Sequence, residues 1–164
     1  MTQDVHSLSI LVSNNPGVLQ RVAQVFSRRG YNIHSLVVSP EMNGSYSRMT
    51  LTVQGNPGDF QQILKSLNKL IDVLHATDHH HQNVVERELA LIKVQATTKN
   101  RTEVLQIVAH FKALTVDYTD SSLIIQVTGN TEKLDAFIAL LKKHHVIELV
   151  RTGKIIMSRG EEQT

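Results

Sequence analysis

The apolar positions of the chain alternate between two periods, one typical of helices and one typical of strands. Between residues 18 and 26 they recur with the 3.6-residue spacing of one helix face, whereas residues 48–53 alternate strictly between polar and apolar side chains. The first stretch predicts an amphipathic helix and the second a half-buried strand. Short apolar runs at residues 7–12, 33–38 and 72–78 predict three further strands.

In the first 80 residues these elements follow the order β-α-β-β-α-β. The first helix is predicted to begin at Pro16 with Asn15 as its N-cap, and Gly30 is predicted to end it as a left-handed cap. A second helix follows Asn56-Pro57-Gly58, with an apolar stripe made of Phe60, Ile63, Leu64, Leu67 and Ile71. This order predicts a ferredoxin-like unit, in which both helices cover one side of an antiparallel sheet.

The same order recurs after the polar run at residues 79–83. Strands are predicted at residues 89–96, 115–118, 123–127 and 146–150, and helices at residues 100–111 and 131–143. Glu103, three residues after Asn100, predicts a capping box at the first of these helices. The fold class is therefore α+β, with two ferredoxin-like βαββαβ domains in tandem: residues 1–80, and residues 81–164 with a partly mobile tail.

Composition excludes several classes of protein. The 164 residues are 41% hydrophobic and 20% charged, and 17 Lys and Arg against 15 Asp and Glu give a net charge of +2, too small to argue for nucleic acid by itself. The chain has no cysteine, so disulfides, thiolate metal sites and cysteine nucleophiles are excluded. Because no apolar run reaches the ~18–20 residues of a membrane span and the first residues lack a signal-peptide pattern, we expect a cytoplasmic protein.

The residues around the start of the first helix could bind a small zwitterion. Unpaired N–H groups at a helix N-terminus attract an anion, and Gly17, which has no Cβ, would let a carboxylate approach the backbone. Asn14 precedes the cap, and Asn32 begins the neighbouring strand, which we expect next to the same end of the first strand. Their amide oxygens could accept the ammonium of an α-amino acid. A plain strand-to-helix connection prefers the same residue types, and that is how we interpret residues 56–58.

Other chemistries have weaker support. His75, Asp78, His79, His80 and His81 could hold zinc or nickel, as could His144 with His145, although a solvated polar linker is the simpler interpretation of the histidine run. RNA-binding modules of this topology stack bases on aromatic residues of the central strands, and residues 48–53 contain none. No nucleophile–base pairing, metal triad or phosphate loop has a recognisable spacing, so we expect no catalytic residues.

Several segments spread along the chain resemble one family, the small regulatory subunits of acetolactate synthase (acetohydroxyacid synthase). They are NNPGVLQRVAQVFSRRGYNIHSLVVSP, SRMTLTV, KLIDVL, VERELALIKV, KLDAF and SRG, and they run from about residue 8 to residue 160. The resemblance implies that the first domain is an ACT domain, an amino-acid-sensing ferredoxin-like module. It implies a further ferredoxin-like domain in the second half.

The same resemblance implies a function and a site. Two ACT domains would join their sheets in a homodimer, and the feedback inhibitor, usually valine, would bind at the seam on positions that map onto Asn14, Gly17 and Asn32. Pro16 departs from relatives that often carry an N–H there, so the carboxylate would rely on the amides of Gly17 and Val18. The chain would activate the large catalytic subunit and confer valine feedback inhibition on branched-chain amino acid biosynthesis.

The resemblance also implies where the cofactors lie and leaves alternatives open. Thiamine diphosphate, Mg and FAD would belong to the large subunit, with no cofactor or metal on this chain. An alternative is a free-standing ACT-domain amino-acid sensor that acts on another enzyme or a transcription factor, although no helix-turn-helix segment with a basic face is evident. A metal-responsive module that uses the histidine run is a third possibility.

Overall fold

The chain divides into two compact units. The computed structural model describes residues 4–79, 83–161 and 163–164. Unit 1 comprises Met1–Val85 together with Gly153–Thr164, and unit 2 comprises Glu86–Thr152. Compared with the predicted domains, 1–80 and 81–164, the division differs mainly in the last twelve residues, which return to the first unit.

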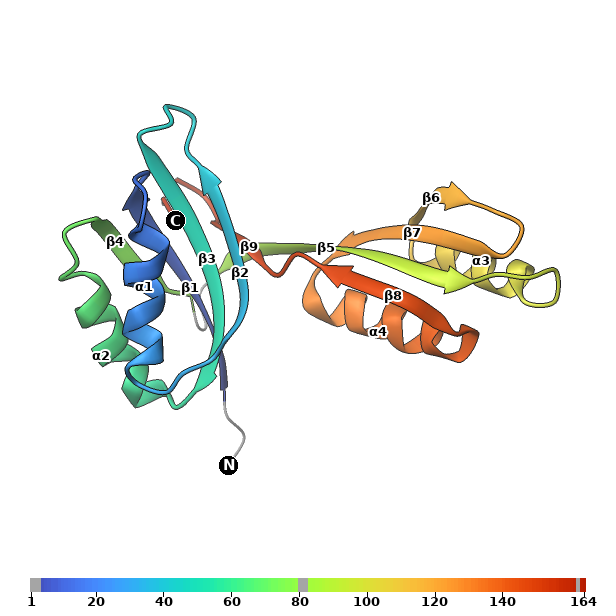
Figure 1. The fold of residues 1–164 in the computed structure, drawn as a ribbon, viewed down its shortest axis with the longest axis horizontal. Coiled ribbons are helices and arrows are strands. Elements are labelled where there is room, and N and C mark those ends of the chain that lie inside the picture. Colours follow the sequence, from blue (N-terminus) through green and yellow to red (C-terminus); the bar gives the residue numbers. More distant parts are fainter. Residues whose placement is uncertain (1–3, 80–82, 162) are drawn as a thin grey trace. The chain divides into compact units, whose positions relative to one another are not determined.

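The first unit has the predicted ferredoxin-like order. Its elements are β1 (Asp4–Ser13), α1 (Val18–Ser27), β2 (Ile33–Pro40), β3 (Tyr46–Gly55), α2 (Pro57–Leu67) and β4 (Val73–Asp78). The strands form an antiparallel sheet in the order β2-β3-β1-β4, and both helices lie on one side of it (Figure 1). The predicted order of elements is confirmed for this half of the chain.

The core of this unit lies between the sheet and its helices. Alternate residues of the two central strands point toward the helices, because successive side chains of a strand face opposite sides. Fully buried core side chains of the sheet and the helices include Leu8, Ile10, Leu51, Val53, Val22, Phe60, Ile63 and Leu67. Sequence alternation in β1 and β3 therefore decides which face of the sheet the helices cover.

The second unit repeats the arrangement. Its elements are β5 (Val84–Gln95), which begins in the first unit, then α3 (Arg101–His110), β6 (Leu114–Tyr118), β7 (Ser122–Gly129), α4 (Thr131–Leu141), the 3₁₀ turn η1 (Lys142–His144) and β8 (Val146–Arg151). The strand order is β6-β7-β5-β8. Ala90, Ile92 and Val94 of β5 pack with Leu134 and Phe137 of α4 in a separate core. The two-domain α+β fold is confirmed.

The C-terminal segment, for which a partly mobile tail was predicted, forms a strand. β9 (Ile155–Ser158) pairs with β5, and Ile156 is buried. The segment also contacts the sheet of the first unit, because a Cβ on Gly153 would come within 2.5 Å of the Ser35 side chain and Arg48 donates a hydrogen bond to the Thr164 carbonyl. These contacts explain why the tail belongs to unit 1.

Local predictions failed at two helix ends. Ile71, predicted on the buried stripe of α2, is 96% exposed because the helix ends at Leu67. Asn68 ends it: the side-chain amide donates to the Leu64 carbonyl at 3.0 Å and its oxygen accepts from the Ala76 N–H. The capping box at α3 is also not formed, since the Asn100 side chain accepts from the Thr97 N–H at 2.8 Å instead of capping the helix.

A buried carboxylate joins three elements of the second unit. Glu88 of β5 is 6% exposed and accepts hydrogen bonds from Arg151 Nε of β8 and Thr131 Oγ1 of α4, both at 2.5 Å. Arg151 also donates to Asp135 at 2.7 Å. Burial acts to lower the pKa of Arg151, but the hydrogen bonds to the two carboxylates outweigh it and raise this pKa above its usual value.

Removing this carboxylate will destabilise the second unit. Glu88→Ala leaves Arg151 and Thr131 without their buried acceptor, so we expect the free energy of unfolding to fall by about 2–4 kcal/mol. Urea denaturation of the full chain measures the change. Glu132→Gln serves as the control, because Glu132 is exposed and follows Thr131 in the first turn of α4. The free energy of unfolding of this variant should stay within about 0.5 kcal/mol of that of the parent chain. Equal effects of both substitutions would contradict the buried role of Glu88.

Candidate functional site

The two Asn-Pro-Gly tripeptides of the chain adopt different conformations. At residues 56–58, Asn56 is the N-cap and the helix begins at Pro57, so Gly58 is already helical. At residues 15–17, Gly17 itself is the N-cap, with a left-handed φ of 81°, and the helix begins only at Val18. The predicted N-cap at Asn15 and helix start at Pro16 are therefore wrong. A left-handed residue at this position requires glycine, because a side chain is strained there.

Gly17 leaves backbone donors open at the start of α1. No side chain caps this end within the described residues, and the Val18 N–H reaches the Asn15 carbonyl only at 3.4 Å. The amides of Leu19 and Gln20 have no acceptor in the described part of the chain, as expected for the first turn of a helix. Val18 is 2% exposed, and its side chain is part of the hydrophobic core. This end of the helix can bind a carboxylate.

Asn14 lies beside these donors in a fixed position. Its backbone N–H donates to the Ser45 carbonyl and its side-chain amide donates to the Gly44 carbonyl, both at 3.0 Å. These bonds hold the side chain against the β2–β3 turn. The Asn14 side-chain oxygen remains available to accept a hydrogen bond from an ammonium group.

An ion pair that sequence analysis missed supports the same turn. Arg21 Nε donates to Asp72 Oδ2 at 2.6 Å, and the Asp72 carbonyl accepts from the Ser13 N–H at 2.8 Å. Arg21 also crowds Gly17, since a Cβ there would lie 3.2 Å from the guanidinium. The available sequence signal was weak: an arginine four residues after the glycine, on the same side of a helix. The pair joins α1 to the segment before β4.

Asn32 lies at the other end of the unit, which corrects the expectation that it lies beside Asn14. β1 and β2 both run antiparallel to β3, with Ser13 opposite the first residue of β3 and Ile33 opposite Val53 near its end. The ten residues of α1 run back along the sheet between the two positions, a length of about 15 Å. Within one copy, Asn14, Gly17 and Val18 are brought together and Asn32 is not.

Asn32 borders a cavity of its own. A cavity of about 450 Å³ lies between the end of α1 and the start of β2, and its lining includes Phe26, Tyr31 and Asn32. The Tyr31 hydroxyl donates to Asp59 at 2.5 Å, and this hydrogen bond, together with burial, raises the pKa of Tyr31. The ring also fills the space above Gly55, where a Cβ would lie 2.4 Å from it. This end therefore has a fixed, partly apolar wall.

The histidine candidates do not form a metal site in the described residues. His80 and His81 lie outside these residues. His79 is buried, and its backbone N–H donates to the Ser7 carbonyl at 2.9 Å. Asp78 bonds His6 Nδ1 at 2.7 Å, and His144 lies 3.6 Å from Glu103. No group of three potential ligands able to hold a metal ion occurs where the structure is described.

None of the helices described is long and apolar enough to cross a membrane.

The two tripeptides provide a matched test of the left-handed glycine. Gly17→Ala places a Cβ on a residue with φ of 81° and against Arg21, so we expect a loss of about 1–2 kcal/mol in the free energy of unfolding. Gly58→Ala, at the equivalent tripeptide position, meets open space inside a helix and should raise the stability by about 0.5–1 kcal/mol. Thermal unfolding of both variants measures the difference. Equal changes in unfolding temperature, in the same direction for both variants, would contradict the different backbone conformations of Gly17 and Gly58.

Comparison with protein families assigns both halves of the chain. Residues 8–75 match the model of the AHAS small subunit-like ACT domain, which covers the sheet and helices described above. Residues 87–160 match the model of the small subunit of acetolactate synthase. The two matches correspond to the two ferredoxin-like halves.

Similar proteins match along almost their whole length. The chain is 43% identical over 158 residues to a probable acetolactate synthase small subunit of Archaeoglobus fulgidus, covering 96% of this chain and 99% of that one. It is 41% identical over 157 residues to the acetolactate synthase small subunit of Bacillus subtilis, covering 95% and 91%. The crystal structure of the small subunit from Thermotoga maritima superposes with a TM-score of 0.87 at 38% identity, covering 97% of this chain and 99% of that one. The chain belongs to the family of acetolactate synthase small subunits.

Proposed function

We propose that this chain is a cytoplasmic, non-catalytic regulatory subunit that activates a large acetolactate synthase subunit and makes it sensitive to valine. The observation that carries the proposal is the start of α1 in the ACT domain, where the left-handed Gly17 leaves amide donors open beside Asn14. Membership of the small-subunit family supports a large catalytic subunit as the partner. Thiamine diphosphate, Mg and FAD would then be held by that partner.

The amino-acid site would be completed by a second copy of the chain. β2 is an edge strand of the first sheet, so its outer backbone groups can pair with the same strand of another copy. In an antiparallel β2–β2 pair the two strands run in opposite directions. The Asn32 end of one copy would then meet the Asn14 and Gly17 end of the other, and the opposite positions of these residues in one copy support a shared site.

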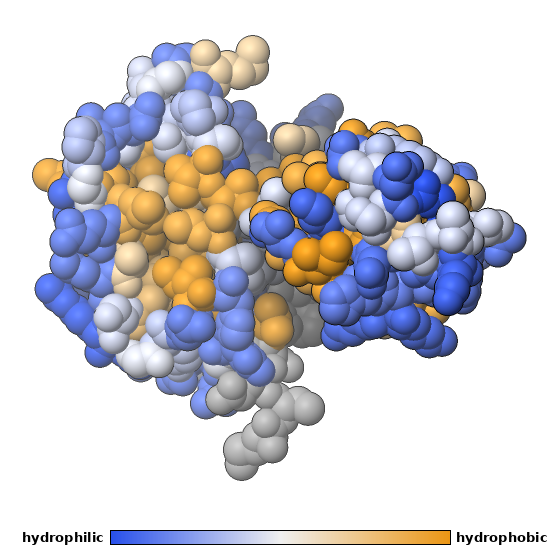
Figure 2. All heavy atoms as spheres, turned by 45° about the vertical axis from the view of Figure 1, so that its right-hand side comes forward, coloured by the Kyte–Doolittle hydropathy of each residue, from blue (hydrophilic) through white to orange (hydrophobic). Residues whose placement is uncertain are grey.

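Exposed apolar side chains on α1 and β2 could form part of such a dimer interface. Leu19 of α1 and Val38 of β2 are 43% and 44% exposed, and Leu36 is half-buried. Figure 2 shows apolar side chains gathered on one face of the first unit. Burial of such side chains would stabilise a dimer at about 25 cal/mol per Å² of apolar surface removed from water.

The proposed ligand contacts match the groups of valine. The amides of Gly17 and Val18 would bind the carboxylate, the oxygens of Asn14 and Asn32 would accept from the ammonium, and apolar side chains at the seam would contact the isopropyl group. Because valine would bind one arrangement of the pair better than another, it would shift the partner subunit between two states. A coupling of about 1–3 kcal/mol would change activity about 5–150-fold.

Reconstitution with a large subunit tests the proposal. We expect the chain to copurify with the large subunit and raise its activity, and valine to reverse the gain. Asn14→Ala and Asn32→Ala should each weaken valine inhibition about tenfold or more, because each removes an ammonium acceptor, while activation stays intact. Asn56→Ala, at the N-cap of α2 where no ligand is proposed, is the control and should leave inhibition unchanged.

Two outcomes would contradict parts of the proposal. Loss of activation together with inhibition in the asparagine variants would show that these residues are structural. Valine binding by a chain that does not copurify with the large subunit would favour the alternative, a free-standing sensor acting on another enzyme or a transcription factor.

Mixing the two asparagine variants distinguishes a shared site from a site within one copy. In a mixed dimer, one shared site would lack both side chains and the other would retain both, since each site takes Asn14 from one copy and Asn32 from the other. Co-expression of Asn14→Ala and Asn32→Ala chains in equal amounts should therefore restore about a quarter of the high-affinity sites. Calorimetric titration with valine counts these sites. A mixture with none restored would show that the site does not use these two residues from different copies.

A further inference from the structure

The turn between β2 and β3 contains the only Asn-Gly dipeptide of the sequence, Asn43-Gly44. Both residues are exposed, as is Met42 before them. Gly44 is left-handed, with φ of 71°. Apart from its chain neighbours, no heavy atom of the described residues lies within 4 Å of the place where a Cβ would stand on Gly44. The dipeptide therefore lies in an open part of the turn.

The turn holds the Asn43 side chain toward the Gly44 nitrogen. Asn43 Oδ1 accepts a hydrogen bond from the Ser45 N–H at 3.1 Å, which closes a loop of atoms that contains both Asn43 Cγ and this nitrogen. The same bond draws electron density from the side-chain carbonyl and makes Cγ a better electrophile. One contact opposes a reaction between them: the Gly44 N–H donates to the Glu41 carbonyl at 2.9 Å, and this bond must open before the nitrogen can attack.

The other asparagines of the sequence are less suited to this reaction. Asn15 and Asn56 precede proline, whose nitrogen has no hydrogen to lose. Each of the others precedes a residue whose Cβ restricts the approach of the nitrogen. They are Asn14, Asn32, Asn68, Asn83, Asn100 and Asn130. Asn130 is in addition held at the start of α4, where its side chain accepts from the Lys133 N–H at 3.1 Å.

The turn also holds Asn14, a residue of the proposed amino-acid site. Asn14 Nδ2 donates to the Gly44 carbonyl and the Asn14 N–H donates to the Ser45 carbonyl, both at 3.0 Å. The ends of the turn are fixed, because the Glu41 N–H donates to the Tyr46 carbonyl at 2.8 Å. A longer backbone inside the turn therefore has to displace the two carbonyls that hold Asn14.

We propose that Asn43 is a site of spontaneous deamidation and that its isoaspartate product weakens the amino-acid site. The Gly44 nitrogen attacks Asn43 Cγ and closes a succinimide ring, the Cγ–Nδ2 bond breaks, and Nδ2 leaves as ammonia with the Gly44 amide proton. Water then opens the ring at Cγ, which gives aspartate, or at the backbone carbonyl of residue 43, which gives isoaspartate. Only isoaspartate adds a carbon to the main chain. The effect on the amino-acid site rests on the proposed function.

Peptide mapping of the full chain tests the modification. Trypsin releases residues 30–48 as one peptide, which contains both Asn32 and Asn43. During warm incubation at neutral pH we expect this peptide to gain the mass of one amide-to-acid conversion, located at Asn43 by fragmentation, and an isoaspartyl methyltransferase to label the product. Asn32 and Asn130 are the internal controls and should convert about tenfold more slowly or less, because a Cβ follows each of them.

Valine inhibition of the reconstituted enzyme tests the link to the amino-acid site. The isoaspartate fraction, separated by ion exchange, should need about tenfold more valine for half-inhibition than the fresh chain, because Asn14 is no longer held in place. Asn43→Gln has a longer side chain that would have to close a larger ring, so its valine response should persist during the incubation. Freshly prepared Asn43→Asp carries the charge of the products on an unchanged backbone and should respond to valine like the fresh parent chain.

Each part of the inference has its own contrary outcome. Conversion of Asn43 no faster than that of Asn32 and Asn130 would overturn the modification site. An unchanged valine response in the isoaspartate fraction, or an equal loss in fresh Asn43→Asp, would overturn the effect of the longer backbone. A fresh parent chain that shows no valine inhibition would refute the proposed function and the link to its site, whereas the peptide result would stand.

Discussion

The organisation of this protein depends on one constraint: in each unit both helices must lie on the face of the sheet that carries its alternate apolar residues. Leu8, Ile10 and Leu51 set this face in the first unit, and Ile92 and Ile125 set it in the second. Helix α1 then has to leave the end of β1 and run back along the sheet before β2 can begin. The constraint therefore separates the two ends of α1, and it leaves each unit with an opposite face and with edge strands.

Separation of the helix ends gives the proposed amino-acid site its form. Gly17 and Asn14 lie where α1 starts, and Asn32 lies where the chain enters β2, so one copy would present two half-sites at opposite ends of the unit. A shared site of this kind would link ligand binding to the association of two copies, because each site would take Asn14 and Gly17 from one copy and Asn32 from the other. Such linkage is the physical basis on which a small ligand shifts a dimer between states.

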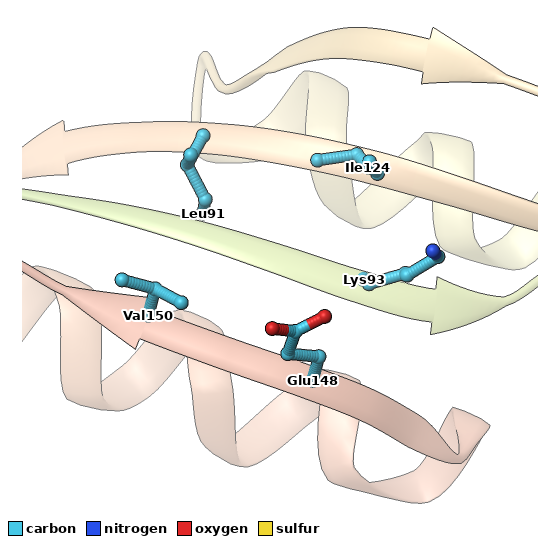
Figure 3. Close-up of a pocket in the computed structure, with 5 residues that line it drawn as sticks. All are labelled: Leu91, Lys93, Ile124, Glu148 and Val150. Atoms are coloured by element: carbon cyan, nitrogen blue, oxygen red, sulfur yellow. The ribbon is translucent and has the colours of Figure 1, made fainter.

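The two units show how the same fold can differ on its second face. In the first unit hydroxyl-bearing side chains line this face, and the chain's own C-terminal segment covers it. In the second unit Leu91 and Val150 on this face remain exposed (Figure 3). Buried polar networks differ as well: Glu88 and Arg151 join sheet and helix in the second unit, whereas Arg21 and Asp72 join a helix to a loop in the first.

Sequence alone determined the two ferredoxin-like halves, the order of their elements and most of the core, because periods of 2 and 3.6 residues report directly which side of a strand or helix is buried. It also singled out Gly17 and Asn14, since donors at a helix start are a local property. The identical tripeptides at residues 15–17 and 56–58 show its limit: their local preferences are the same, yet only one glycine is left-handed. Contacts with Arg21, the return of β9 to the first unit and the position of Asn32 at the far end of the sheet involve residues distant in sequence. Only the tertiary structure decides them, because strand register and packing fix which ends of the elements meet.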